Sequence, residues 1–227
     1  MQTRHIAKKS AVITMDYLKW HNEQRVKGFL ELAAITNFAF HTGGVPECDK
    51  AIQVMQGCEP FMGLKKPGFR KFGPPVFVGH TNKDRKGFEG WCKNNGIVVV
   101  GNKRDNKFYR EKLFKLCHSS IAVIGPQRVA DGCTLHDTYG YCSNRLFVIT
   151  GYAGCMLHQW FPGIENYFKP NEEILVWNNL EELLEQIAVL KQNPEKSVSI
   201  AEAGYKRARK EHTYENRTKK ILKAVGL

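Results

Sequence analysis

Short apolar runs alternate with longer amphipathic stretches along most of this chain, and this alternation restricts the fold more than any other feature. The apolar runs are rich in β-branched residues, as in Val76–Gly79 and Ile97–Val100. Runs of this kind predict strands, and the amphipathic stretches between them predict helices. The pattern therefore predicts an α/β fold with a mostly parallel sheet.

The second part of the chain contains enough elements for one Rossmann-like domain. Its predicted strands are Val76–Gly79, Ile97–Val100, Ile121–Ile124, Met156–His158 and Ile174–Trp177. Its predicted helices are Arg85–Asn94, Phe108–Cys117, Arg145–Tyr152, Leu180–Gln192, Lys196–Arg209 and Tyr214–Ala224. Five strands with interleaved helices are sufficient for a parallel sheet of this type.

The first part of the chain is too short for a second domain of the same size. Its predicted strands are Ala11–Met15, Asn37–His41 and Glu59–Gly63, and its predicted helices are Glu23–Ala34 and Glu47–Gln56. Lys65–Pro75 is rich in Lys, Gly and Pro and has no periodicity, which indicates a linker. We therefore divide the chain into a truncated α/β domain over residues 1–64, a linker over 65–75, and a Rossmann-like domain with C-terminal helices over 76–227.

The composition is that of a globular protein with a basic surface. Hydrophobic residues make up 42% and charged residues 25%, which excludes a disordered chain. The net charge of +12 predicts attraction to a polyanion, which can be a nucleic acid, an anionic membrane surface or a phosphorylated substrate. No apolar run approaches the length of a membrane span, and nothing before Ser10 resembles a signal peptide. We therefore expect a cytoplasmic protein.

The seven cysteines are an odd number and form no Cys-x-x-Cys pair. Several lie among apolar or small residues, which favours reduced thiols in a reducing compartment. Cys117-His118, Cys133-x-x-His136 and Cys142 could be assembled into a zinc site, but zinc sites of this kind usually have paired short spacings. We therefore favour structural cysteines and expect no metal ion or other cofactor.

Ser143 and Asn144 precede an apolar helix, and Arg145 stands in its first turn. Either polar residue can cap the helix, and the N–H groups and positive dipole end of such a helix can bind a phosphate. The guanidinium of Arg145 can add a bidentate hydrogen bond. The alternative interpretation is an ordinary capped helix with a surface arginine.

Two strand ends carry further candidates, because ligands of α/β proteins bind at the carboxyl ends of parallel strands. Gly79 ends a predicted strand and permits the close approach of a phosphate, and it is followed by His80 and Arg85. No Gly-x-Gly-x-x-Gly is present, so the dinucleotide-binding fingerprint is absent. Asp16 ends the first predicted strand, where a turn-forming aspartate is the alternative to a functional one.

The region from Val76 to Leu227 resembles the CgeB-like (spore-maturation type) glycosyltransferases, a branch of the two-domain GT-B enzymes. The resemblance rests on Ser143-Asn144-Arg145, the following apolar helix with Gly154, the element from His158 to Glu165, and the ending Glu211–Arg217. It is faint over Ala11–Leu64. Asn144 replaces the aspartate that the family usually carries, which removes a charge.

The resemblance implies a binding site for a nucleotide-sugar donor. Its expected residues are Gly79, His80, Arg85, Ser143, Asn144, Arg145, Gly154 and Glu165. Arg85, Arg145 and backbone N–H groups near Gly154 would neutralise the leaving diphosphate, which is the role that a metal ion has in other transferases. Glu165 would bind the ribose hydroxyls or simply stabilise a helix start. Asp16 is the candidate catalytic residue on the acceptor side.

The sequence thus predicts a metal-independent GT-B glycosyltransferase that uses a donor such as a UDP-sugar. The net charge of +12 makes a modified base in DNA an attractive acceptor, and such a base would have to flip out of the duplex. The alternative is a non-catalytic nucleotide- or nucleic-acid-binding module, which the short first part would explain.

Overall fold

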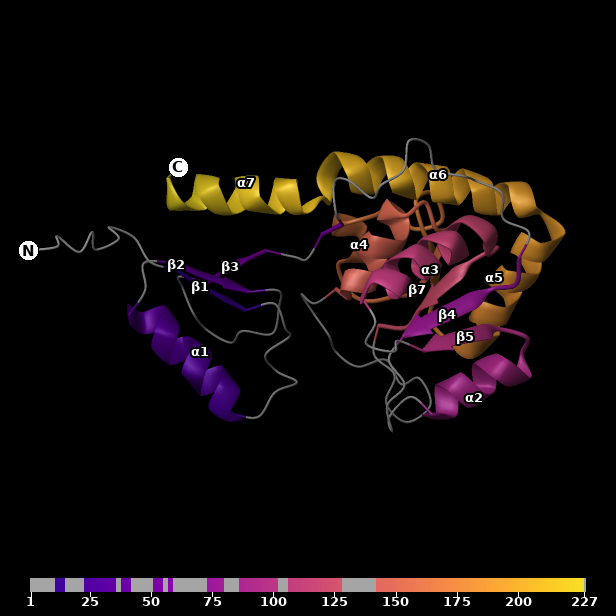
Figure 1. Cartoon of the computed structure of the whole chain (residues 1–227), viewed down its shortest axis with the longest axis horizontal. Coiled ribbons are helices and arrows are strands. Elements are labelled where there is room, and N and C mark those ends of the chain that lie inside the picture. The colour runs from indigo at the N-terminus through magenta and orange to yellow at the C-terminus, as the bar shows by residue number, and fades with distance from the viewer. Residues whose placement is uncertain are drawn as a thin grey trace, which may run out of the picture.

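The computed structural model describes residues 11–14, 23–35, 38–41, 51–54, 57–58, 73–79, 86–101, 106–127 and 142–226. Its largest sheet has five strands: β4 (Val76–Gly79), β5 (Val98–Gly101), β6 (Val123–Gly125), β7 (Met156–Gln159) and β8 (Leu175–Trp177). All neighbouring strands are parallel and lie in the order β5-β4-β6-β7-β8. Their carboxyl ends therefore meet at one edge of the sheet (Figure 1).

Helices cover both faces of this sheet. They are α2 (Lys86–Asn94), α3 (Asn106–Ser119), α4 (Asn144–Gly151), α5 (Leu180–Gln192) and α6 (Pro194–Glu211). Successive residues of a strand point to opposite faces, so Val76 and Val78 pack with α3 and α4, whereas Phe77 packs with α2. Two apolar cores form in this way, one on each face, and the result is a doubly wound α/β unit.

A second, smaller sheet lies in the first part of the chain. It has three parallel strands in the order β1-β2-β3: β1 (Ala11–Thr14), β2 (Phe38–His41) and β3 (Ala51–Gln53). Helix α1 (Glu23–Ile35) connects β1 and β2, and it buries Phe29 and Ala33. The two sheets together confirm the predicted fold class of parallel α/β type.

One predicted element is wrong. The sequence predicted a helix over Glu47–Gln56, but residues 51–53 form β3, which pairs with β2 from Ala39↔Ala51 to His41↔Gln53. Pairing with a buried strand overrides local helix propensity here, since Ile52 is directly opposite the buried Phe40. The strand predicted at Glu59–Gly63 and most of the predicted linker at Lys65–Pro75 lie outside the described residues, so the domain boundaries stay predictions.

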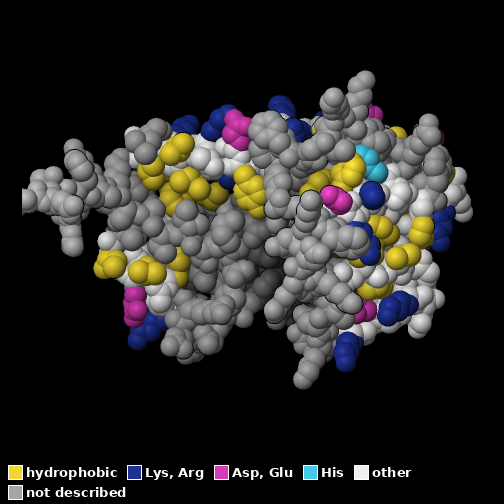
Figure 2. Space-filling model, viewed as in Figure 1, with side chains coloured by type: hydrophobic (Ala, Val, Ile, Leu, Met, Phe, Trp, Pro, Cys, Tyr) yellow, Lys and Arg dark blue, Asp and Glu magenta, His cyan; other side chains and the backbone are white. Residues whose placement is uncertain are grey.

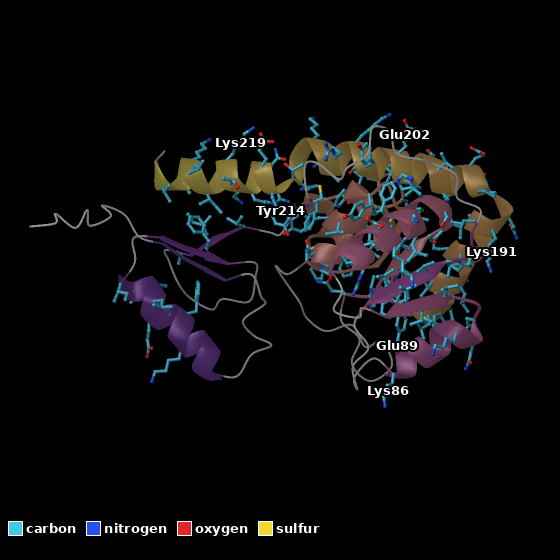
Figure 3. All side chains as sticks on the ribbon, viewed as in Figure 1. Lys86, Glu89, Lys191, Glu202, Tyr214 and Lys219 are labelled. Atoms are coloured by element: carbon cyan, nitrogen blue, oxygen red, sulfur yellow. The ribbon has the colours of Figure 1, made fainter. Side chains whose placement is uncertain are left out.

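The last helix starts where residues 57–58 meet the end of α6. Cys58 donates a backbone hydrogen bond to His212 O (2.8 Å) and accepts one from Tyr214 N (2.9 Å). Thr213 caps α7 (Tyr214–Val225) through a capping box with Asn216. From this junction, where Tyr214 is labelled in Figure 3, α7 extends toward the side of the molecule that holds the three-stranded sheet (Figures 1 and 3).

No helix within the described ranges is long and apolar enough to cross a membrane. The described cysteines, which are Cys58, Cys92, Cys117, Cys142 and Cys155, are all buried. Within the same ranges no three His, Cys, Asp or Glu side chains come close enough together to hold a metal ion. Cys133 and His136, which the zinc alternative requires, lie outside them.

The packing of α6 gives a testable requirement for Gly204. A Cβ at this position would lie 2.4 Å from the backbone oxygen of Glu173, which cannot move without displacing the chain before β8. We expect Gly204→Ala to lower the free energy of unfolding by about 1–3 kcal/mol, because overpacking outweighs the better helix propensity of alanine. Denaturant unfolding measures this difference.

Gly90 in α2 is the matched control, because a Cβ there would meet nothing within 4 Å. Gly90→Ala is expected to be neutral or to stabilise by up to about 1 kcal/mol. Equal stabilities of the two variants would contradict the close packing of α6 on the residues before β8.

Candidate functional site at the carboxyl edge of the sheet

Helix α4 starts at the carboxyl edge of the five-stranded sheet and points its amino end there. Ser143 is its N-cap, and the Ser143 Oγ accepts a hydrogen bond from the backbone N–H of Arg145 (3.4 Å). Leu146 and Phe147 anchor the first turn in the core. The predicted cap is therefore present, and the positive end of the helix dipole faces the same edge as the strand ends.

Arg145 extends from α4 across the ends of β4 and β6. Its Nη1 donates to the backbone oxygen of Pro126, just after β6 (3.3 Å), and its Cζ lies 5.7 Å from the centre of the Phe77 ring. The chain runs from β4 to β5 on one side and then returns past β4 to β6 on the other. Ligands of doubly wound sheets bind where the strand order reverses in this way. Arg145 thus places a guanidinium at the switch point of this sheet.

Two glycines make room for this arrangement. A Cβ on Gly79 would lie 2.8 Å from the Phe77 ring and 3.3 Å from Arg145 Nη2. A Cβ on Gly125 would lie 3.0 Å from His158 Cδ2 and 3.6 Å from Arg145 Cδ. Gly79 was predicted as a site residue, whereas Gly125 was missed. In the sequence Gly125 follows an apolar run that predicts a strand, as Gly79 does at the end of β4.

His158 stands beside Arg145 and is fully buried near the end of β7. Burial lowers the pKa of His158 to about 3, while the hydrogen bond with the backbone oxygen of Gln159 raises it and the charge of Arg145 lowers it. The imidazole is therefore neutral near pH 7. In the sequence, His158 stands out only as part of the element from His158 to Glu165, and it is not among the predicted site residues.

Several buried polar atoms at this edge have no hydrogen-bond partner within the described part of the chain. They are Asn144 Oδ1, His158 Nε2 and Gln159 Nε2. Gln159 Oε1 accepts a hydrogen bond from the backbone N–H of Gln127 (3.2 Å). The Nε2 of Gln159 therefore points away from Gln127. Buried polar groups are nearly always satisfied in folded proteins. Their concentration at the strand ends therefore marks a place where water or a ligand completes the structure.

Glu165 lies at the same edge. It belongs to the 3₁₀ helix η3 (Ile164–Asn166), which follows β7 after Gly163 turns the chain with a φ of 88°. The Glu165 side chain is exposed, and its Oε1 accepts a hydrogen bond from Trp160 Nε1 (3.3 Å). A carboxylate in this position can accept hydrogen bonds from hydroxyl groups of a ligand, and the predicted role of Glu165 in ribose binding stays a prediction.

Gly154 does not belong to this site. It precedes β7 and therefore lies at the amino edge of the sheet, where a Cβ would contact Ile149 and the Sγ of Cys117. Its N–H group already donates to the backbone oxygen of Ile149 (2.9 Å). Gly154 allows α4 to pack close to β7, and the structure contradicts its predicted role in diphosphate binding.

The remaining predicted site residues cannot be placed. Asp16, His80 and Arg85 lie outside the described residues, and their predicted roles stay predictions. Ser143, Asn144, Arg145, Gly79 and Glu165 are the predicted residues that the structure brings to one edge.

The ending Glu211–Arg217 has a structural role. His212 is buried, its Nε2 lies 2.7 Å from the backbone oxygen of Tyr167, and its Nδ1 lies 2.9 Å from Arg217 Nη2. A carbonyl oxygen only accepts and a guanidinium only donates, so Nε2 carries the proton and Nδ1 is the acceptor. His212 thus connects α6, α7 and the segment after η3 instead of facing a ligand.

The comparisons with known proteins agree with this fold. The profile of the glycosyl transferase-like family matches residues 62–223, and the chain belongs to this family. A comparison with curated proteins finds no match.

Solved structures show the same fold at low sequence identity. HepE from Anabaena, whose crystal structure contains UDP and glucose, superposes with a TM-score of 0.66 at 11% identity, over 96% of this chain and 71% of HepE. TarM from S. aureus, in a complex that contains UDP, gives a TM-score of 0.66 at 9% identity, over 96% of this chain but only 51% of TarM. Sucrose-phosphate synthase from Thermosynechococcus elongatus gives 0.60 at 10% identity, over 93% of this chain and 63% of that enzyme. These neighbours define an α/β fold of GT-B type with a Rossmann-like C-terminal part.

Proposed function

We propose that this protein is a glycosyltransferase that transfers a sugar from a nucleotide-sugar donor, such as a UDP-sugar, to an acceptor. The observation that carries the proposal is the guanidinium of Arg145 at the switch point, next to the amino end of α4 and the glycine end of β4. A diphosphate fits this combination, because guanidinium groups bind phosphates bidentately and helix amino ends attract anions. The UDP in the HepE and TarM structures supports a uridine nucleotide.

In the proposed reaction the protein stabilises the leaving nucleoside diphosphate by fixed positive groups. As the bond between sugar and phosphate breaks, negative charge accumulates on the diphosphate oxygens, and Arg145 and the dipole of α4 are already oriented toward it. Arg85 is a proposed second cation, and Asp16 remains the proposed base on the acceptor side. Glu165 is proposed to bind the ribose. The order of motifs from Ser143 to Arg217 supports placement in the CgeB-like branch of the family.

Release of nucleoside diphosphate from a nucleotide sugar tests this function. We expect release from a UDP- or GDP-sugar, with water or an added acceptor, and we expect it to persist in EDTA because Arg145 supplies the positive charge. Binding without any release would support the alternative of a non-catalytic nucleotide-binding module. If the protein neither bound a nucleotide sugar nor released a nucleoside diphosphate from it, both the transferase and the nucleotide-binding module would be contradicted.

The proposed acceptor is polyanionic, and a modified base in DNA is its concrete form. The net charge of +12 supports this proposal. Figure 2 shows Lys and Arg side chains spread over the visible face instead of gathered in one patch. A distributed positive charge favours attraction along a nucleic acid backbone without selecting a sequence.

We expect the affinity for duplex DNA to fall steeply with salt, by about tenfold or more between 50 and 200 mM, because Lys and Arg displace counterions from phosphates. Fluorescence anisotropy with a labelled duplex measures this dependence. No detectable binding at low salt would rule out a DNA acceptor but would not contradict the proposed donor site. The odd number of cysteines and the absence of a Cys-x-x-Cys pair also support our proposal that the protein works in the cytoplasm.

A further inference from the structure

The hydrogen bonding of His158 determines which of its ring nitrogens is protonated. His158 Nδ1 lies 2.6 Å from the backbone oxygen of Gln159. A carbonyl oxygen can only accept a hydrogen bond, so Nδ1 of the neutral ring carries the proton. Nε2 therefore presents a lone pair and can only accept a hydrogen bond.

This acceptor lies within the candidate site. His158 Cδ2, the ring atom next to Nε2, is 3.0 Å from the position that a Cβ of Gly125 would occupy, and Arg145 Cδ is 3.6 Å from the same position. The ring edge with Nε2 thus faces the end of β6, where Arg145 crosses the sheet. Within the described residues Nε2 has no hydrogen-bond partner, although the residue is fully buried.

The chemistry of this atom selects its ligand. An ionised phosphate has only acceptor oxygens near neutral pH and cannot donate to a lone pair, whereas a sugar hydroxyl can donate. Arg145 has only donors and suits the phosphate. The two neighbouring side chains are therefore complementary to the two adjoining parts of one ligand, a charged diphosphate and a hydroxylated ring.

We propose that His158 Nε2 accepts a hydrogen bond from a hydroxyl group of the nucleotide-sugar donor, next to the diphosphate bound by Arg145. This inference rests on the proposed function. It makes His158 a specificity-determining residue that recognises hydroxyl groups, in addition to the phosphate recognition by Arg145. The hydroxyl can belong to the transferred sugar or to the ribose, which share this chemistry.

Two substitutions separate the lone pair from the volume of the side chain. His158→Phe retains a ring and removes the acceptor, whereas His158→Gln places an amide oxygen near the position of Nε2. We expect His158→Phe to weaken binding of UDP-glucose by roughly 3- to 10-fold, the usual effect of one lost hydrogen bond, and His158→Gln to restore most of it. Isothermal titration of UDP-glucose and UDP, with thermal unfolding as a check on folding, measures both.

The two ligands distinguish the sources of the hydroxyl. A loss confined to UDP-glucose identifies a sugar hydroxyl, and an equal loss for UDP identifies a ribose hydroxyl. Equal affinities of wild type and a folded His158→Phe variant for both ligands would overturn the proposal and would show that Nε2 faces only water. The wild-type titration separates this failure from a failure of the proposed function, because a protein that is no donor-binding protein would bind neither ligand.

Discussion

Replacement of Arg145 by alanine is expected to weaken the binding of a nucleoside diphosphate by about 100-fold, which is the upper range for hydrogen bonds to a charged group. The guanidinium is held between the ends of β4 and β6 by the Pro126 oxygen and the Phe77 ring, so it is oriented before the ligand arrives. Turnover is expected to fall at least as much, because the charge on the leaving diphosphate grows in the transition state. Titration with UDP and measurement of nucleotide release give the two values.

Arg145→Lys and Lys206→Ala complete this test. Arg145→Lys retains the charge but loses the planar fork, and we expect it to recover only part of the affinity. Lys206 pairs with Glu202 on the exposed surface of α6, so Lys206→Ala removes one solvent-exposed positive charge and is expected to leave affinity unchanged. If Arg145→Ala bound UDP as tightly as Lys206→Ala, the switch point would not be the diphosphate site.

Acidification below pH 6.5 is expected to destabilise the fold through two buried histidines. Burial lowers the pKa of His158 to about 3 and that of His212 to about 4. In the unfolded chain both have the ordinary value of about 6.5. Between these values the unfolded chain binds protons that the folded chain does not. The contribution of the two histidines to the free energy of unfolding is therefore fully present above pH 6.5 and is lost as the pH decreases. Each histidine contributes up to about 1.4 kcal/mol per pH unit.

His158→Gln isolates one of the two contributions. The variant lacks the titrating ring. Between pH 6.5 and pH 5 its free energy of unfolding should therefore fall by about 2 kcal/mol less than that of the wild type. Urea unfolding at both pH values measures the difference. The same pH dependence in both proteins would mean that His158 titrates normally in the fold and is not held neutral.

The five-stranded sheet was predictable because its strands are apolar runs that are buried on both faces. Val76–Gly79 is an example, since all four residues are buried and the sequence boundary coincides with β4. β3 was not predictable in the same way, because Ala51–Gln53 is short and becomes a strand through its pairing with β2. Local propensity predicts secondary structure poorly where pairing with another strand determines it.

The candidate site was predictable at its helix start but not at its strand ends. Ser143 and Arg145 form a local pattern that is complete within a few residues, and the structure confirms the cap. Gly154 was assigned by its place in a motif, and the error arose because a glycine before a strand lies at the opposite edge from one after it. Gly125 and His158 depend on contacts between different strands, which spacing along one segment does not reveal.

Isothermal titration of the wild-type protein with UDP and GDP shows whether the strand ends of the five-stranded sheet bind a donor nucleotide. We expect saturable one-to-one binding of at least one of these diphosphates, weakened by higher salt because Arg145 and the amino end of α4 attract the anion. No binding of either nucleotide to the folded protein at millimolar concentration would contradict the assignment of the strand ends as a donor site.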